Sequence, residues 1–491
     1  MENLHMRLII EKKLKREIKI LNILKDNTNS ISAKELADEL NASEKTVVSD
    51  IEEIKKKIPL EWNIIFKKNV GYTITISDEF GFANFIKELI EESPLFVIVS
   101  SLFNNELFSI EEWEERLYMT ESTLKRALGV LRGVLQEFKL KLALNPIDIS
   151  GNEVNIRYFF FQFFYSSDKT PHLQRPTAKE ILFYDQLKIT IGEGGAFNQL
   201  QYYRSLYWIM IIHRRVRSKH VANLDDNLIK SVQSQTNYNY LSRTMEVFST
   251  IFDLELSIDD FVFLYLIRWD ALILDTSEKF IYIDGFNSLI EKKIKLLVLE
   301  KVPDFRIDTN AYPFIFNYFE VYFNHLLIMC QMSSLFQKNS DETNYFIKNR
   351  HFAIFEKWID ILNNNIEIFS SISDLCLEDI AVQLTMLTFP HVQKEKTKPT
   401  HILFLFDASL TNLLYLNSLA ERFILNNVRV TVLSNKKIEN SLIEKIDADI
   451  IVSNNLLTVL GRNVYLISSI PTAREWDNIS NLVLNLNDIG N

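Results

Sequence analysis

One sequence pattern, typical of a helix-turn-helix, occurs twice in this chain at an offset of seventy-seven residues. Its first copy is clearest at Ser43–Pro59, SEKTVVSDIEEIKKKIP. Ser43 can cap the start of a helix there, and Pro59 cannot continue a helix interior. Apolar side chains recur at three- and four-residue steps, and polar or basic side chains cover the opposite face. The stretch therefore predicts an amphipathic helix whose apolar face must pack on a neighbour.

That neighbour is predicted directly upstream. Leu14–Lys25 repeats apolar residues at helical spacing and reads as a first helix. Ser32 and Glu35 form a capping box that opens a second helix, which we expect to end at Leu40. A helix, a tight turn and a second helix with a polar leading face make the helix-turn-helix arrangement.

A β-hairpin is predicted after the second of these helices. Asn63–Phe66 and Tyr72–Ile76 alternate apolar and polar residues on either side of a turn that contains Gly71. Lys67 and Lys68 lie near the tip. Such a hairpin is typical of the wing of a winged helix. The alternative is a small helical core whose charged face is merely solvated.

The second copy reproduces the pattern without a gap. Ser109 and Glu112 form a second capping box, and Thr120 stands where Ser43 caps the first recognition helix. Leu142–Ile156 supplies Pro and Gly turns between short apolar runs, which predicts another wing. Repetition at a fixed offset indicates a duplicated unit. Two adjacent winged helices suit a long duplex site.

The outward faces of both predicted recognition helices carry polar and basic groups suited to a DNA groove. The formal net charge of −10 does not exclude this, because local charge on the docking face governs binding to a polyanion. The second unit is more acidic around Glu111–Glu115, so its contribution to affinity is open. The expected DNA contacts are Lys45, Thr46, Ser49, Lys55, Lys56, Lys67 and Lys68 in the first unit and Thr123, Lys125, Arg126 and Arg132 in the second.

Composition is typical of a globular protein with several domains. The 491 residues are 47% hydrophobic and 24% charged, with 35 Phe and little Gly or Pro, so we expect mostly helix with aromatic cores. The two cysteines exclude a disulfide framework and suit a reducing cytoplasm. Phe261–Leu274 and Phe314–Met332 are the most apolar stretches, but both contain polar or charged residues. They predict buried helices and no membrane insertion.

The remainder of the chain predicts two further architectures. From about Pro171, long amphipathic patterns such as Tyr312–Gln337 and Asn344–Asn363 predict helical bundles. From His401, strands alternate with helices, which predicts an α/β domain with a parallel sheet. The expected fold class is a mainly α multidomain protein. Its predicted domains are winged helices at 1–76 and 77–165, bundles at 170–292 and 293–397, and the α/β domain at 398–491.

This order of parts resembles the Mga-type virulence regulators of Gram-positive bacteria. The resemblance rests on domain order, on Thr46–Ile51 in the first recognition helix, and on the Ile149–Glu153 turn before Arg157. It implies that the bundles are phosphotransferase-system regulation domains (PRDs) and that the last domain is EIIB-like. It also implies a promoter-binding transcription regulator, an activator, that forms a homodimer or larger oligomer through its C-terminal domain. Histidine phosphorylation by HPr or an EII component would tune its activity or its self-association.

Three histidines are candidates for that phosphorylation. A phosphoacceptor needs a reachable imidazole nitrogen with positive charge nearby. His213 precedes the basic residues Arg214, Arg215 and Arg217 and is expected to be half-buried. His220 is predicted to follow on the same apolar face of that helix. The resemblance adds His391. The competing interpretation is that a histidine on an apolar helical face is a hydrogen-bonded core residue.

Two other functions are alternatives to DNA binding. An RNA-binding antiterminator with the same regulation domains would open with a small β-domain, whereas this chain opens with helices. A phosphotransferase component of the EIIB type needs a cysteine after its first strand, but Asp407 follows that strand here and the domain has no cysteine. We expect no enzymatic activity, no cofactor and no metal site.

Overall fold

The computed structural model divides into two compact units, Met1–Val392 and Gln393–Asn491, which are described separately. Asp407 and most of the chain between the strands of the predicted α/β domain lie outside the described residues. The structure describes residues 4–27, 30–68, 70–76, 79–91, 93–165, 174–192, 202–234, 238, 242–267, 288–307, 315–392, 400–406, 416, 428–434, 446–454, 464–468, 471, 475, 476, 478–480, 482 and 483.

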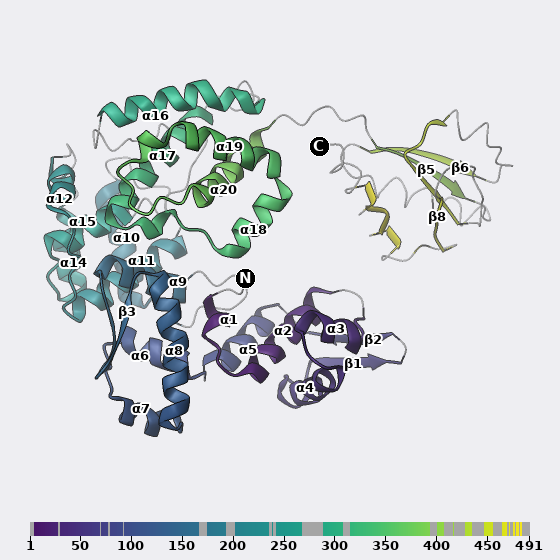
Figure 1. The fold of residues 1–491 in the computed structure, drawn as a ribbon, viewed down its shortest axis with the longest axis horizontal. Helices are drawn as coiled ribbons and strands as arrows, with labels where there is room; N and C mark the ends of the chain where they lie inside the picture. Colours follow the sequence, from purple (N-terminus) through teal and green to yellow (C-terminus); the bar gives the residue numbers. More distant parts are fainter. Residues whose placement is uncertain are drawn as a thin grey trace. The chain divides into compact units, whose positions relative to one another are not determined.

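The first winged helix forms as predicted (Figure 1). Its two strands pair antiparallel, with Ile64 opposite Ile74, and Ile31 bridges to Tyr72 beside them. Buried apolar residues of the helices and of β1 share one core. The elements are α1 (Leu4–Leu8), α2 (Lys12–Asp26), α3 (Ala33–Leu40), α4 (Glu44–Lys57), β1 (Asn63–Lys67) and β2 (Gly71–Thr75).

The second winged helix is followed by a helix that the sequence analysis missed. The predicted wing over Leu142–Ile156 is too long, because β4 ends at Ser150 and Val154 already lies in α9. Every residue of α9 except Gln162 is buried, so the helix shows no amphipathic period. The elements are α5 (Glu79–Glu91), α6 (Pro94–Phe103), α7 (Ile110–Leu117), α8 (Glu121–Glu137), β3 (Lys141–Leu144), β4 (Ile147–Ser150) and α9 (Glu153–Phe164).

Helices make up the described part of residues 174–392. The pattern over Tyr312–Gln337 predicts one helix, but the helix in the structure ends at Met332. The pattern over Asn344–Asn363 also predicts one helix, but two helices meet at His351. The elements are α10 (Ala178–Gly192), α11 (Tyr202–Arg217), α12 (Asp226–Gln233), α14 (Arg243–Phe252), α15 (Ile258–Ile267), α16 (Ser288–Lys301), η2 (Val302–Phe305), α17 (Ile315–Met332), η3 (Ser334–Gln337), α18 (Asp341–Arg350), α19 (Phe352–Asn364), η4 (Ile366–Phe369), α20 (Leu377–Thr388) and η5 (Phe389–His391).

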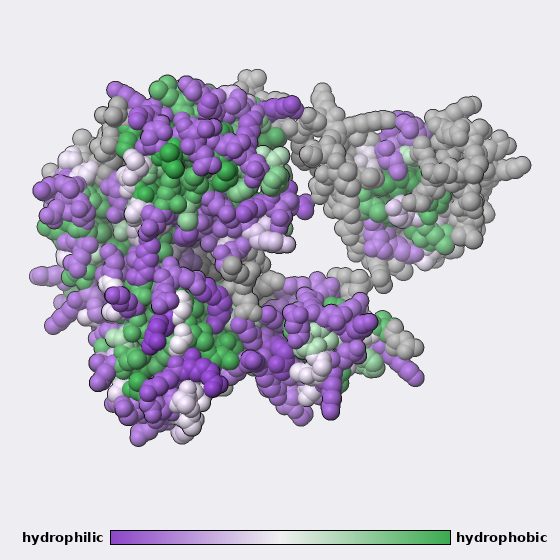
Figure 2. Space-filling model, in the orientation of Figure 1, coloured by the Kyte–Doolittle hydropathy of each residue, from purple (hydrophilic) through white to green (hydrophobic). Residues whose placement is uncertain are grey.

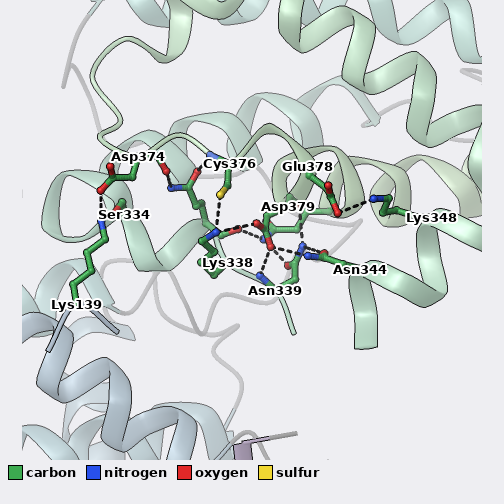
Figure 3. A network of polar contacts seen from close by, with 12 residues as sticks. Lys139, Ser334, Lys338, Asn339, Asn344, Lys348, Asp374, Cys376, Glu378 and Asp379 are labelled. Atoms are coloured by element: carbon green, nitrogen blue, oxygen red, sulfur yellow. Dashed lines mark hydrogen bonds and ion pairs between the residues drawn. The ribbon is translucent and has the colours of Figure 1, made fainter. Parts of the chain in front are cut away.

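Two hydrophobic clusters fill this unit. One runs from the first winged helix through α15, and the other gathers residues from α16 to α20. Helix α17 contributes to both, with Met329 in the first cluster and Phe319 in the second. A polar network also links Lys139, after α8, to Ser334 and Asp374 (Figure 3). The second winged helix therefore packs directly on the helical region.

The C-terminal unit contains the predicted parallel sheet. All its strand pairs are parallel, in the order β6-β5-β7-β8. Every residue of β5 is buried, as expected for a central strand covered on both faces. No helix in the described ranges combines the length and the apolar composition that spanning a membrane requires. The strands are β5 (Thr400–Phe406), β6 (Val428–Ser434), β7 (Ile450–Ser453) and β8 (Val464–Leu466).

Candidate nucleic-acid interface

The first helix-turn-helix is fixed by three local features. Ser32 Oγ accepts the Glu35 N–H at 3.2 Å, while the Glu35 carboxylate accepts the Ser32 N–H at 2.8 Å. Asn41 takes the left-handed conformation (φ 49°) that turns the chain between α3 and α4. Ser43 Oγ then accepts the Thr46 N–H at 3.1 Å. The predicted capping box and helix cap are confirmed, and together they set the angle at which α4 leaves the turn.

The second helix-turn-helix repeats this geometry with one difference. Ser109 and Glu112 form the capping box, and Tyr118 takes the left-handed conformation (φ 51°) at the position of Asn41. Thr120 is the N-cap of α8 as predicted, but its side chain accepts no cap N–H from a described residue. Its hydroxyl lies 2.9 Å from that of Thr123 instead.

Helix α4 is held on α2 by two ion pairs that sequence reasoning missed. Arg16 Nε donates to buried Asp50 at 2.7 Å, and Lys57 Nζ donates to buried Glu17 at 2.6 Å. Arg16 follows Lys15 and Lys57 follows Lys56 in the sequence, yet both side chains compensate buried carboxylates. The sequence signal for such ion pairs is an acidic residue on the apolar face of each helix. In α4, for example, Asp50 directly precedes the apolar Ile51.

The outer face of α4 is partly as predicted. Lys45 and Ser49 are exposed. Thr46 is half-buried, and its hydroxyl lies 2.8 Å from Ser43 Oγ, so part of its hydrogen-bonding capacity serves the cap. Val48, which the sequence analysis passed over, is 38% exposed. This face thus offers an ammonium, a hydroxyl and a small apolar group to a partner.

The basic residues of the first unit differ in how far their charge is compensated. Lys55 Nζ lies 2.8 Å from Glu52, and Lys56 Nζ lies 2.7 Å from Glu53. The hydrogen bond to Glu53 raises the pKa of Lys56. By contrast, no ion pair joins Lys45, Lys67 or Lys68 to a residue within the described ranges. These three ammonium groups remain available to an anion.

On the second recognition helix, α8, the predicted residues are exposed. Thr123 contacts the Thr120 hydroxyl, and Lys125 pairs with Glu121. Arg126 and Arg132 form no ion pair in the described part of the chain. Gly129 and Gly133 lie on this helix with open space around them, because an added Cβ would meet nothing within 4 Å. The two recognition helices therefore share a frame but expose different chemistry.

His213 is buried rather than half-buried. Its Nδ1 lies 2.6 Å from Glu180 Oε1, and its ring stacks on Phe252 with centroids 4.1 Å apart. Burial would raise the pKa of Glu180, but hydrogen bonds from His213 and Thr177 outweigh it and lower that pKa to about 2. This geometry is that of a paired core histidine joining α10 to α11.

The other two histidines lie in different settings. The prediction that His220 continues the stripe of α11 is wrong, because the helix ends at Arg217 and Lys219 turns left-handed. His220 is half-buried beyond that end, and its carbonyl accepts a hydrogen bond from Arg157 at 3.0 Å. His391 ends η5 and is also half-buried. Burial lowers the pKa of both imidazoles.

Two winged helix-turn-helix units in tandem place this chain among proteins of the DNA-binding helix-turn-helix class. Two family models match at these places: an HTH domain over residues 16–73 and the Mga helix-turn-helix domain over residues 78–164. The resemblance to Mga-type virulence regulators is thereby confirmed.

Similarity to individual regulators extends along nearly the whole chain. The capsule synthesis positive regulator AcpB of Bacillus anthracis is 24% identical, over 96% of this chain and 98% of its own length. The anthrax toxin expression trans-acting positive regulator of the same organism is 20% identical, over 96% and 99%. The capsule synthesis positive regulator AcpA is 22% identical, over 58% and 63%.

Proposed function

We propose that this protein is a cytoplasmic transcription activator that binds promoter DNA through both winged helices. The main support for this proposal is the pair of helix-turn-helix units. Each has an exposed polar recognition face, and in each a left-handed residue makes the turn between the two helices. The positive regulators to which the chain is similar support the sign of its effect. The two winged helix-turn-helix units favour this function over an RNA-binding antiterminator, and we propose no enzymatic role.

In this proposal α4 enters a major groove. Lys45, Thr46 and Ser49 lie nearest the base edges, and Val48 adds an apolar contact of the kind that recognises a thymine methyl. The phosphate contacts would come from Lys55, Lys56, Lys67 and Lys68. Lys67 and Lys68 are expected to matter more than Lys55 and Lys56, which neighbouring glutamates already compensate. In α8 the corresponding residues are Thr123, Lys125, Arg126 and Arg132.

Fluorescence anisotropy with a promoter duplex, at several salt concentrations, tests the proposal. Lys68→Ala should weaken binding to all sequences alike and lower the salt slope by about one, whereas Lys45→Ala should cost about 1–3 kcal/mol and relax specificity. Lys230→Ala removes one charge from α12 and serves as the control. Unchanged duplex binding in both Lys45→Ala and Lys68→Ala would show that the docking face is wrong.

We further propose that the helical bundles are PRD-like, that the parallel-sheet domain is EIIB-like, and that the protein works as a homodimer. Phosphorylation of His213 by a phosphotransferase-system donor would place a near-dianion beside the Glu180 carboxylate. The like charges would separate α10 from α11, which gives the modification a route to the rest of the first bundle.

Incubation with phosphorylated HPr, followed by phosphate-affinity electrophoresis at neutral pH, tests this reading. His213→Ala, His220→Ala and His391→Ala assign any acid-labile label to one site. Label that persists in all three variants would overturn the assignment. If the chain binds DNA but accepts no label, the proposed DNA-binding regulator stands and its proposed control by phosphorylation fails.

A further inference from the structure

A cavity of about 660 Å³ lies where the connection after α6 faces the C-terminal end of α11. Its walls carry three arginines, one glutamate and a set of neutral amide and hydroxyl groups. The lining residues are Phe103, Asn104, Asn105, Glu106, Gln174, Arg175, Arg214, Arg217 and Ser218. None of them belongs to the faces proposed to meet DNA.

The arginines of this cavity differ from Arg215, which lies between two of them on α11. Arg215 forms a bidentate pair with buried Glu153 at 2.7 and 2.8 Å. Arg175, Arg214 and Arg217 have no ion pair with any residue in the described ranges, and the Arg214 Nε is buried there without a hydrogen-bond partner. Glu106 supplies one negative charge to the lining against three guanidinium groups, so the cavity has a net positive charge that favours an anionic ligand.

Both walls are held by contacts of their own. Asn104, Asn105 and Glu106 each donate a backbone N–H to the last turn of α6, at 3.2, 3.1 and 2.9 Å. On the other side, Tyr207 donates its hydroxyl to the Gln174 carbonyl at 2.8 Å, which fixes the residue before Arg175. The backbone of both walls is therefore fixed by contacts within the chain, as is usual in ligand sites.

We propose that this cavity binds a small organic phosphate that also carries hydroxyl groups. Planar guanidinium forks match phosphate oxygens and bind them bidentately. Asn104, Asn105, Gln174 and Ser218 can exchange hydrogen bonds with hydroxyls, and Glu106 can accept from one. The volume lies within the range of small-molecule sites. An extended apolar ligand does not fit so polar a lining.

Isothermal titration calorimetry on the full chain tests this, with ribose 5-phosphate as the probe and ribose as its uncharged counterpart, at fixed ionic strength. Ribose 5-phosphate should bind at submillimolar concentration and ribose should not. Arg175→Gln and Arg217→Gln, which change exposed side chains, should each weaken binding about tenfold or more. Lys179→Gln removes an equal charge from the exposed surface of α10 and should change nothing.

Binding of ribose 5-phosphate that is equal in all variants would overturn the proposal, and so would no binding at all. If the sugar phosphate does not bind and Arg175→Gln and Arg217→Gln lose duplex affinity, the cavity is assigned to DNA instead. Because the titration reads the small ligand directly, its outcome is independent of whether the chain regulates transcription.

Discussion

The two winged helices share a backbone frame and differ at many of the positions that face outward. Both have a capping box, a left-handed turn residue and an N-cap, each at the same seventy-seven-residue offset. Yet the outward stripe of α4 is Lys45, Ser49, Glu52 and Lys56, whereas at the same positions α8 has Ser122, Arg126, Gly129 and Gly133. The duplication keeps the residues that set helix geometry, and the residues that would meet DNA are free to differ.

The two units also differ in how they are anchored. The Arg16–Asp50 pair holds α4 to α2 inside the first unit, and the Arg16 side chain is 25% exposed. The second unit continues into α9, where fully buried Arg157 donates to Glu153 at 3.1 Å and to Asp260 of α15 at 2.6 Å. The second winged helix is thus joined to α15 by buried charge, while in the first unit water can reach the Arg16 side of the Arg16–Asp50 pair.

The largest expected effect separates these two anchors. Arg157→Met should destabilise the region around α9 by about 3–5 kcal/mol, because Asp260 would keep a buried charge without its cation. Arg16→Met should cost less, since its partner gains water when the pair is lost. Hydrogen-exchange mass spectrometry on the full chain reads α9 and α4 separately. Equal losses of protection in the two variants would remove the distinction between the anchors.

The second effect concerns the two recognition faces. Arg126→Ala should cost about 1–3 kcal/mol of affinity for a promoter duplex, and should relax specificity at positions other than those affected by Lys45→Ala. Binding of a panel of duplexes with single base-pair changes measures both. If Arg126→Ala leaves every duplex unaffected while Lys45→Ala does not, the second unit is a scaffold that joins the first to the bundles.

Much of this frame was predictable because its signals are local. The capping boxes at Ser32 and Ser109 and the antiparallel wings depend on residues a few positions apart, and both were confirmed. Helix α9 was missed because a helix buried on all sides has no amphipathic period. The break at His351 was missed because apolar spacing continues across it from α18 into α19.

The predicted surfaces were harder to specify than the frame. The exposure of Lys45 and Arg126 follows from the helical period. By contrast, the ion pairs of Arg16 and Lys57 with buried carboxylates depend on residues 34 and 40 positions away. Likewise the Glu180 partner of His213 comes from another helix. Such pairings are set by tertiary packing, which no local pattern reports.

A smaller effect tests the one difference in helix capping. Ser43→Ala should destabilise the start of α4 by about 1 kcal/mol, because the Thr46 N–H loses its acceptor. Thr120→Ala should cost only a few tenths, since the Thr120 hydroxyl accepts no cap N–H among the described residues. Exchange rates of amides in the first turn of each helix report this. A cost of Thr120→Ala as large as that of Ser43→Ala would show that the two caps are equivalent.

The smallest effect bears on why α8 keeps glycine on its outward face. Gly129→Ala should stabilise α8 by about 0.4–1 kcal/mol, because alanine restricts the unfolded chain and its Cβ meets nothing within 4 Å. Glu52→Gly, the reciprocal change in α4, should destabilise by a similar amount. If Gly129→Ala also lowers duplex affinity, the glycine permits a close approach of DNA that a methyl group blocks. If duplex affinity is unchanged, α8 makes no close contact with DNA at that position. The DNA-contacting residues of the second unit are then limited to Arg126 and its neighbours.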